Sequence, residues 1–123
     1  MRKLTLVMMC FTPGLAIADA QFVNPMDFDG TDVQKEQVVQ YITEHVHKMY
    51  CDSALDMCQD TMLRMMERQE LSAFKEATQA TDKKIMKKVI ETYCEGAIDM
   101  CSYSTVVMMY RSNLKASQQT LEW

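Results

Sequence analysis

Four cysteines at a regular spacing are the side chains of this sequence with the clearest chemistry. The segment YCDSALDMC at 50–58 contains Cys51 and Cys58, and the segment YCEGAIDMC at 93–101 contains Cys94 and Cys101. We call each segment a cysteine cassette. The fifth cysteine, Cys10, lies in an N-terminal segment that has the features of a cleavable leader. An even number of cysteines in a short exported chain is typical of disulfides, so the sequence predicts two disulfides.

Two connectivities fit this spacing. If the chain bends within each cassette, Cys51 bonds Cys58 and Cys94 bonds Cys101. If a helix runs through each cassette, two cysteines seven apart lie about 10.5 Å apart along the axis and cannot bond each other. They would then pair across a helical hairpin, as Cys51–Cys101 and Cys58–Cys94.

Two pairs of equivalent residues favour the bend. Ser53 in the first cassette corresponds to Gly96 in the second, and both residue types favour a break over a helix interior. Asp56 and Asp99 are good N-cap residues for a helix that follows each cassette. The local pairing is therefore preferred, and the crossed pairing stays open.

Methionine is unusually frequent, with 13 in the chain. Its flexible thioether side chain packs into cores and adapts to partner surfaces. Thioethers also bind Cu(I), which is the alternative chemistry for an exported chain. The sequence predicts a possible binding surface at five methionines: Met62, Met65, Met66, Met108 and Met109.

The other reactive residue types do not form a recognisable catalytic or metal site. His45 and His47 are two apart, so on a helix they point in different directions and form a poor chelate. Asp56 and Asp99 fit helix caps better than an acid and base pair. With three glycines, the chain has neither a phosphate-binding loop nor a loop-built active site. We expect no enzyme activity, no metal site and no cofactor.

The first 20 residues have the three parts of a signal peptide. Arg2 and Lys3 precede an apolar run at 4–11, and Ala18-Asp19-Ala20 is a cleavage sequence of small residues. We therefore expect a signal peptide at 1–20 and a periplasmic or secreted mature protein.

The net charge is −4, and the leader carries more positive than negative charge. A negative chain is a poor partner for nucleic acid. No later segment has the roughly 20 apolar residues that a membrane span requires.

Helix formers dominate the rest of the chain. Neither Gly nor Pro occurs between Thr31 and Glu95, and apolar residues recur at helical spacing. We expect an extended arm at 21–30 whose Phe22 and Phe28 dock on the body, a helical domain at 31–113 and a tail at 114–123. Thr31 is the predicted N-cap of the first helix, and Asp82 that of the third.

The similarity of the two cassettes extends to their flanks. Ile42 matches Ile85, and Met65 matches Met108, at the same offset as the cysteines. The repeat units span about 38–67 and 81–110. The sequence predicts an all-α four-helix bundle made of two helix, cassette, helix units with two disulfides.

This combination favours a small exported binding protein that acts by protein–protein contact in the cell envelope or outside the cell. An inhibitor, an immunity-type protein and a stress chaperone all fit. The alternative is a soft-metal protein that binds or carries copper through methionine and histidine.

Overall fold

The computed structural model describes residues 20–54, 57–97 and 100–123. These ranges contain four helices and no strand: α1 (Asp32–Tyr50), α2 (Asp60–Thr78), α3 (Lys83–Cys94) and α4 (Tyr103–Ser117). The prediction of an all-α fold is confirmed. The predicted signal peptide lies outside the described residues, apart from Ala20.

Side-chain caps start three of the helices. Thr31 Oγ1 accepts a hydrogen bond from Gln34 N at 3.3 Å, and Asp82 Oδ1 accepts one from Ile85 N at 3.0 Å. Both caps were predicted, because a cap is formed with residues only three positions away. Ser102 caps α4 in the same way, by accepting a hydrogen bond from Thr105 N.

The prediction that Asp56 and Asp99 are the N-caps of the helices after the cassettes is wrong. The N-cap positions of α2 and α4 are Gln59 and Ser102, three residues after Asp56 and Asp99. The two aspartates themselves lie outside the described residues. Each helix starts later than predicted, because the chain first passes through the second cysteine of the cassette.

Both cassettes form corners between helices. α1 ends at Tyr50 and α3 ends at Cys94, so no helix runs through a cassette. The disulfides are Cys51–Cys58 and Cys94–Cys101, each with a Cα–Cα distance of 4.5 Å. The preferred local pairing is therefore confirmed, and the crossed pairing is excluded.

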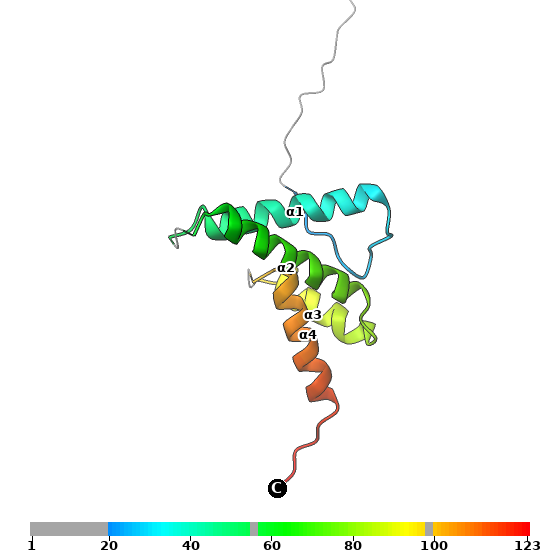
Figure 1. Cartoon of the computed structure of the whole chain (residues 1–123). Coiled ribbons are helices and arrows are strands. Elements are labelled where there is room, and N and C mark those ends of the chain that lie inside the picture. The colour runs from blue at the N-terminus through cyan, green and yellow to red at the C-terminus, as the bar shows by residue number, and fades with distance from the viewer. Residues whose placement is uncertain (1–19, 55–56, 98–99) are drawn as a thin grey trace, which may run out of the picture.

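The four helices form two hairpins that meet through their second members. α1 packs against α2, α3 packs against α4, and α2 packs against α4. Figure 1 shows α1 and α2 side by side, with α4 crossing below α2. The two predicted units correspond to these hairpins, and the central contact is between their equivalent helices α2 and α4.

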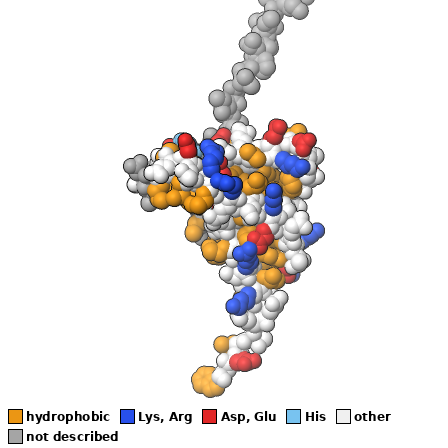
Figure 2. All heavy atoms as spheres, in the orientation of Figure 1, with side chains coloured by type: hydrophobic (Ala, Val, Ile, Leu, Met, Phe, Trp, Pro, Cys, Tyr) orange, Lys and Arg blue, Asp and Glu red, His pale blue; other side chains and the backbone are white. Residues whose placement is uncertain are grey.

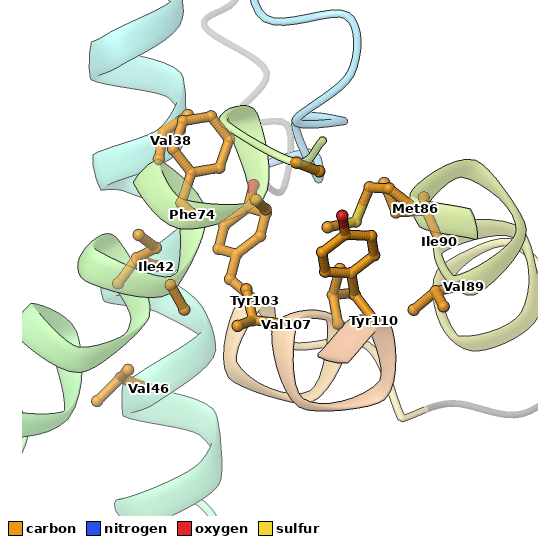
Figure 3. Packing of buried hydrophobic residues seen from close by; sticks show 14 of the residues in the cluster. Val38, Ile42, Val46, Phe74, Met86, Val89, Ile90, Tyr103, Val107 and Tyr110 are labelled. Carbon is orange, nitrogen blue, oxygen red and sulfur yellow. The ribbon is translucent and has the colours of Figure 1, made fainter. Parts of the chain in front are cut away.

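The core lies where the hairpins meet. Figure 3 shows α1 contributing residues at helical spacing on one side, α3 on the other, and two buried tyrosines of α4 between them. Its labelled members are Val38, Ile42, Val46, Phe74, Met86, Val89, Ile90, Tyr103, Val107 and Tyr110. The helical spacing predicts Met49 in the buried stripe of α1 with Val38, Ile42 and Val46, and Val39 beside that stripe. Met49 and Val39 are instead 46% and 53% exposed, because the α2 contact covers a narrower face.

The N-terminal arm docks on this core. Phe22 stacks on Tyr103 with ring centroids 5.1 Å apart, and Phe28 meets the edge of Phe74 at 5.0 Å. Val23 N donates to Tyr103 Oη at 3.2 Å, and Tyr103 Oη donates to Val23 O at 2.9 Å. The predicted docking of both phenylalanines is thus confirmed.

At the other end, α4 extends to Ser117, four residues beyond the domain end expected at 113. Leu114 packs against the core and carries the helix into the predicted tail. The remaining residues are not helical, and Leu121 and Trp123 are fully exposed.

Candidate functional site

The two corners are the most distinctive local structures of the molecule. We call residues 51–58 the first corner and residues 94–101 the second corner. In each, one disulfide joins the end of a helix to the residues just before the next helix. A short covalent loop fixes the chain direction and limits the conformations of the side chains that it carries.

Exposed methionines lie at equivalent positions beside both corners. Met57 and Met65 are 39% and 52% exposed near the first corner, and Met100 and Met108 are 57% and 54% exposed near the second. Figure 2 shows hydrophobic side chains gathered beside the first corner, over the start of α2, and beside the second corner. Single exposed hydrophobic residues are common, but these four repeat in pairs with the cassettes.

The structure divides the five methionines predicted as a binding surface. Met65 and Met108 are at the surface, whereas Met62, Met66 and Met109 are half-buried. Met66 and Met109 pack against the core. Of the five predicted methionines, only Met65 and Met108 are therefore exposed on the helices.

Met57 and Met100 were missed as surface residues. Each directly precedes the second cysteine of its cassette, and the shared sequence DMC was the available signal. Sequence periodicity cannot assign exposure inside a corner, because a non-helical segment has no helical face.

A hollow of about 500 Å³ lies between α1 and the second corner. Met49 lies on the α1 wall and Met100 on the corner wall, while His45 and Lys48 add polar groups. Its full lining is Tyr41, His45, Lys48, Met49, Met100, Cys101, Ser102 and Thr105. This arrangement can hold an apolar side chain or a soft cation.

One side of this hollow is fixed by Tyr41. Its ring stacks on His45 with centroids 5.6 Å apart. Its hydroxyl donates to Cys101 O at 3.5 Å, so the first hairpin contacts the corner of the second.

A buried acid lies near the centre of the molecule and has a structural partner. Glu70 of α2 accepts hydrogen bonds from Tyr103 N at 2.8 Å and Ser104 N at 3.3 Å. These N–H groups belong to the first turn of α4, which lacks helical acceptors and favours negative charge. Burial raises the pKa of Glu70, and the two hydrogen bonds lower it by less. Burial also raises the pKa of the Tyr103 phenol.

Metal-ligand residue types also meet at the first corner. His47, Cys51 and Cys58 place a ring nitrogen and two sulfurs within 4.8 Å of one another. His47 Nδ1 lies 3.7 Å from Asp52 Oδ2. The two histidines point to different surroundings as predicted, with His45 stacked on Tyr41.

The fold and its corners define a small disulfide-bonded helical protein. No protein-family model matches the chain, and no curated protein or solved structure is similar to it. Among the described helices, none combines the length and apolar character needed to cross a bilayer.

Proposed function

We propose that this chain is a small exported binding protein that acts by protein–protein contact through the methionine-bearing surfaces beside its two corners. The observation that carries this proposal is the exposure of Met57, Met65, Met100 and Met108 at equivalent positions of the two hairpins. Met57 and Met100 directly precede a disulfide cysteine, and Met65 and Met108 lie on the helix that follows it.

The physical support is a rigid frame with adaptable side chains. A disulfide-closed corner loses little conformational entropy on binding, which favours affinity. Methionine has three rotatable bonds and a polarisable sulfur, so it can fit differently shaped apolar surfaces. The partner should therefore present apolar side chains.

The periplasm or the cell exterior is the proposed place of action. Disulfides are typical of oxidising compartments, and the first 20 residues have the features of a cleavable leader. A protein of the cell envelope or the medium is the expected partner. Inhibition, immunity-type protection and chaperone activity differ in whether there is one partner or many clients.

The test is capture by the mature chain, purified with its disulfides intact, from envelope and medium fractions of its own cells. The double substitution Met65→Lys/Met108→Lys places a charge on both surfaces. Val33→Lys is the matched control, because Val33 is 66% exposed at the opposite end of α1 from the first corner.

The proposal predicts one partner that binds the wild type and the Val33→Lys variant alike, with at least about tenfold weaker binding by the double variant, equal to about 1.4 kcal/mol. Equal binding by all three proteins, each with wild-type helix content, contradicts it. Suppression of aggregation of many unrelated proteins assigns the chaperone role.

The second candidate is a copper-binding or carrier protein. The specific observation in its favour is that Met49, Met100 and His45 line one hollow. Thioether and imidazole groups bind Cu(I). A competition assay with a Cu(I) chelator should then show one tightly bound ion, lost in Met49→Leu/Met100→Leu. Absence of stoichiometric binding eliminates this candidate.

A further inference from the structure

The first corner places a histidine ring and a carboxylate beside the two sulfurs of its disulfide. His47 lies four residues before Cys51, one helical turn away on the same face. A ring nitrogen of His47 and the sulfurs of Cys51 and Cys58 lie within 4.8 Å of one another, and Asp52 is 3.7 Å from His47 Nδ1. His47 and Cys58 are exposed, so an ion has access from solvent.

We propose that the first corner, after reduction of its disulfide, is a binding site for a thiophilic divalent cation, with Zn²⁺ as the best match. Two thiolates and an imidazole are preferred zinc ligands, and about 2.3 Å for each Zn–S bond implies sulfurs about 3.8 Å apart in a tetrahedral site. The Cα atoms of Cys51 and Cys58 are 4.5 Å apart, and side-chain rotation moves the two sulfurs apart once the S–S bond is broken. Asp52 is placed to be the fourth ligand or to orient the imidazole.

The reduction step is an ordinary exchange with a dithiol. The dithiol supplies two electrons and two protons, so the Cys51–Cys58 S–S bond breaks, two S–H bonds form, and the reductant forms its own disulfide. Binding of Zn²⁺ then releases the two thiol protons. The same corner is thereby closed by a metal ion in place of the covalent bond.

The second corner lacks the decisive ligand. Ile90 occupies the position equivalent to His47 and is 1% exposed in the core. Glu95 occupies the position of Asp52. The two corners therefore differ in this imidazole, and among the described residues only the first corner brings a histidine and two cysteine sulfurs within 4.8 Å of one another.

Two double variants separate the corners. Cys94→Ser/Cys101→Ser retains the first corner, and Cys51→Ser/Cys58→Ser retains the second. The mature forms of both double variants and of the single variant His47→Gln are reduced with a dithiol, which is then removed under anaerobic conditions. Each protein is titrated with Co²⁺ as a spectroscopic probe, and Zn²⁺ is added in competition. Circular dichroism records helix content before and after metal addition.

The chain that retains the first corner should bind one ion with a thiolate-to-cobalt charge-transfer band. Binding should be at least about tenfold weaker in the other double variant and in His47→Gln, as expected for loss of a ligand. If reduction unfolds the chains, metal should restore helix only where the first corner is intact. Equal affinity of the two corners, or equal binding by the oxidised protein, overturns the proposal. This inference does not depend on the proposed binding function.

Discussion

Tyr103 connects more parts of the molecule than any other residue described above. It is fully buried, its ring contacts Phe22, Tyr41 and Phe74, and its backbone N–H donates to Glu70. Its hydroxyl exchanges hydrogen bonds with the peptide of Val23. One side chain therefore couples the N-terminal arm, α1, α2 and α4.

Tyr103→Phe should lower the free energy of unfolding by about 1–3 kcal/mol, because it leaves the peptide groups of Val23 without their partner in a partly buried position. Urea unfolding followed by circular dichroism measures the change. The matched control is Tyr93→Phe, whose hydroxyl has no hydrogen bond within the described part of the chain. Equal effects of the two substitutions would contradict this role for Tyr103.

Glu70 should give the protein a distinctive pH dependence. Burial raises its folded pKa above the ordinary value of 4.5. Between these two pKa values the folded state holds a proton that the unfolded state has lost, so this group adds stability as the pH falls toward 4.5. That contribution is lost as the pH rises through the folded pKa.

The free energy of unfolding of wild type, relative to Glu70→Gln, should therefore increase as the pH is lowered from 7 to 4.5. Urea titrations at several pH values measure this difference, and Glu36→Gln, at an exposed position of α1, provides the control. A difference that stays constant or falls with acidification would refute the assignment.

Residue roles were predictable where they depend on near neighbours in sequence. Thr31 and Asp82 were identified as caps because each bonds a residue three positions on. Glu70 was not identified, since its partners are 33 and 34 residues away and only the α2–α4 contact brings them together. A mid-helix glutamate otherwise looks like a surface residue.

At the scale of elements, helix number and the two bends followed from composition and from Ser53 and Gly96. The starts of α2 and α4 did not, because the length of each corner depends on how its disulfide closes. The exposure of Val39 was also mispredicted, because a period of 3.6 predicts a buried stripe but not its width.

Gly96 has a structural role that its counterpart does not share. A Cβ at this position would lie 2.9 Å from the backbone oxygen of Thr92, whereas Ser53 is accommodated in the first corner and its hydroxyl donates to Met49 O. Gly96→Ala should therefore lower the unfolding free energy by roughly 1 kcal/mol or more.

Thermal unfolding compares Gly96→Ala with Ser53→Ala. The alanine at 53 removes an exposed hydroxyl group, so its effect should be within about 0.5 kcal/mol. A larger loss of unfolding free energy for Ser53→Ala than for Gly96→Ala would contradict this role, because it would show that the second corner accommodates a Cβ at position 96.

At the scale of the whole molecule, the sequence repeat corresponds to two helical hairpins. Their contact through α2 and α4 was not predictable, because the repeat specifies the units and not the faces by which they join. An exposed ion pair between Arg111 of α4 and Glu76 of α2 crosses this contact, but exposed pairs contribute little. Burial of the α4 tyrosines is the larger stabilising term.

The two disulfides are the covalent cross-links that stabilise this fold. Each closes a loop between cysteines seven residues apart, which should stabilise the folded state by about 2–3 kcal/mol through loop entropy. For a chain of this size, both together are a large share of the expected stability. The orientation of the surface methionines depends on these corners being closed locally.

Mapping of disulfides in protein purified from its native compartment, without reductant, tests that claim most directly. Trypsin should release residues 49–64 and 89–111 as single peptides, because neither contains an internal Lys or Arg. Local pairing predicts two separate peptides, each lighter than its reduced form by two hydrogen atoms. A single product in which 49–64 is joined to 89–111, or two peptides with free thiols, would contradict the account.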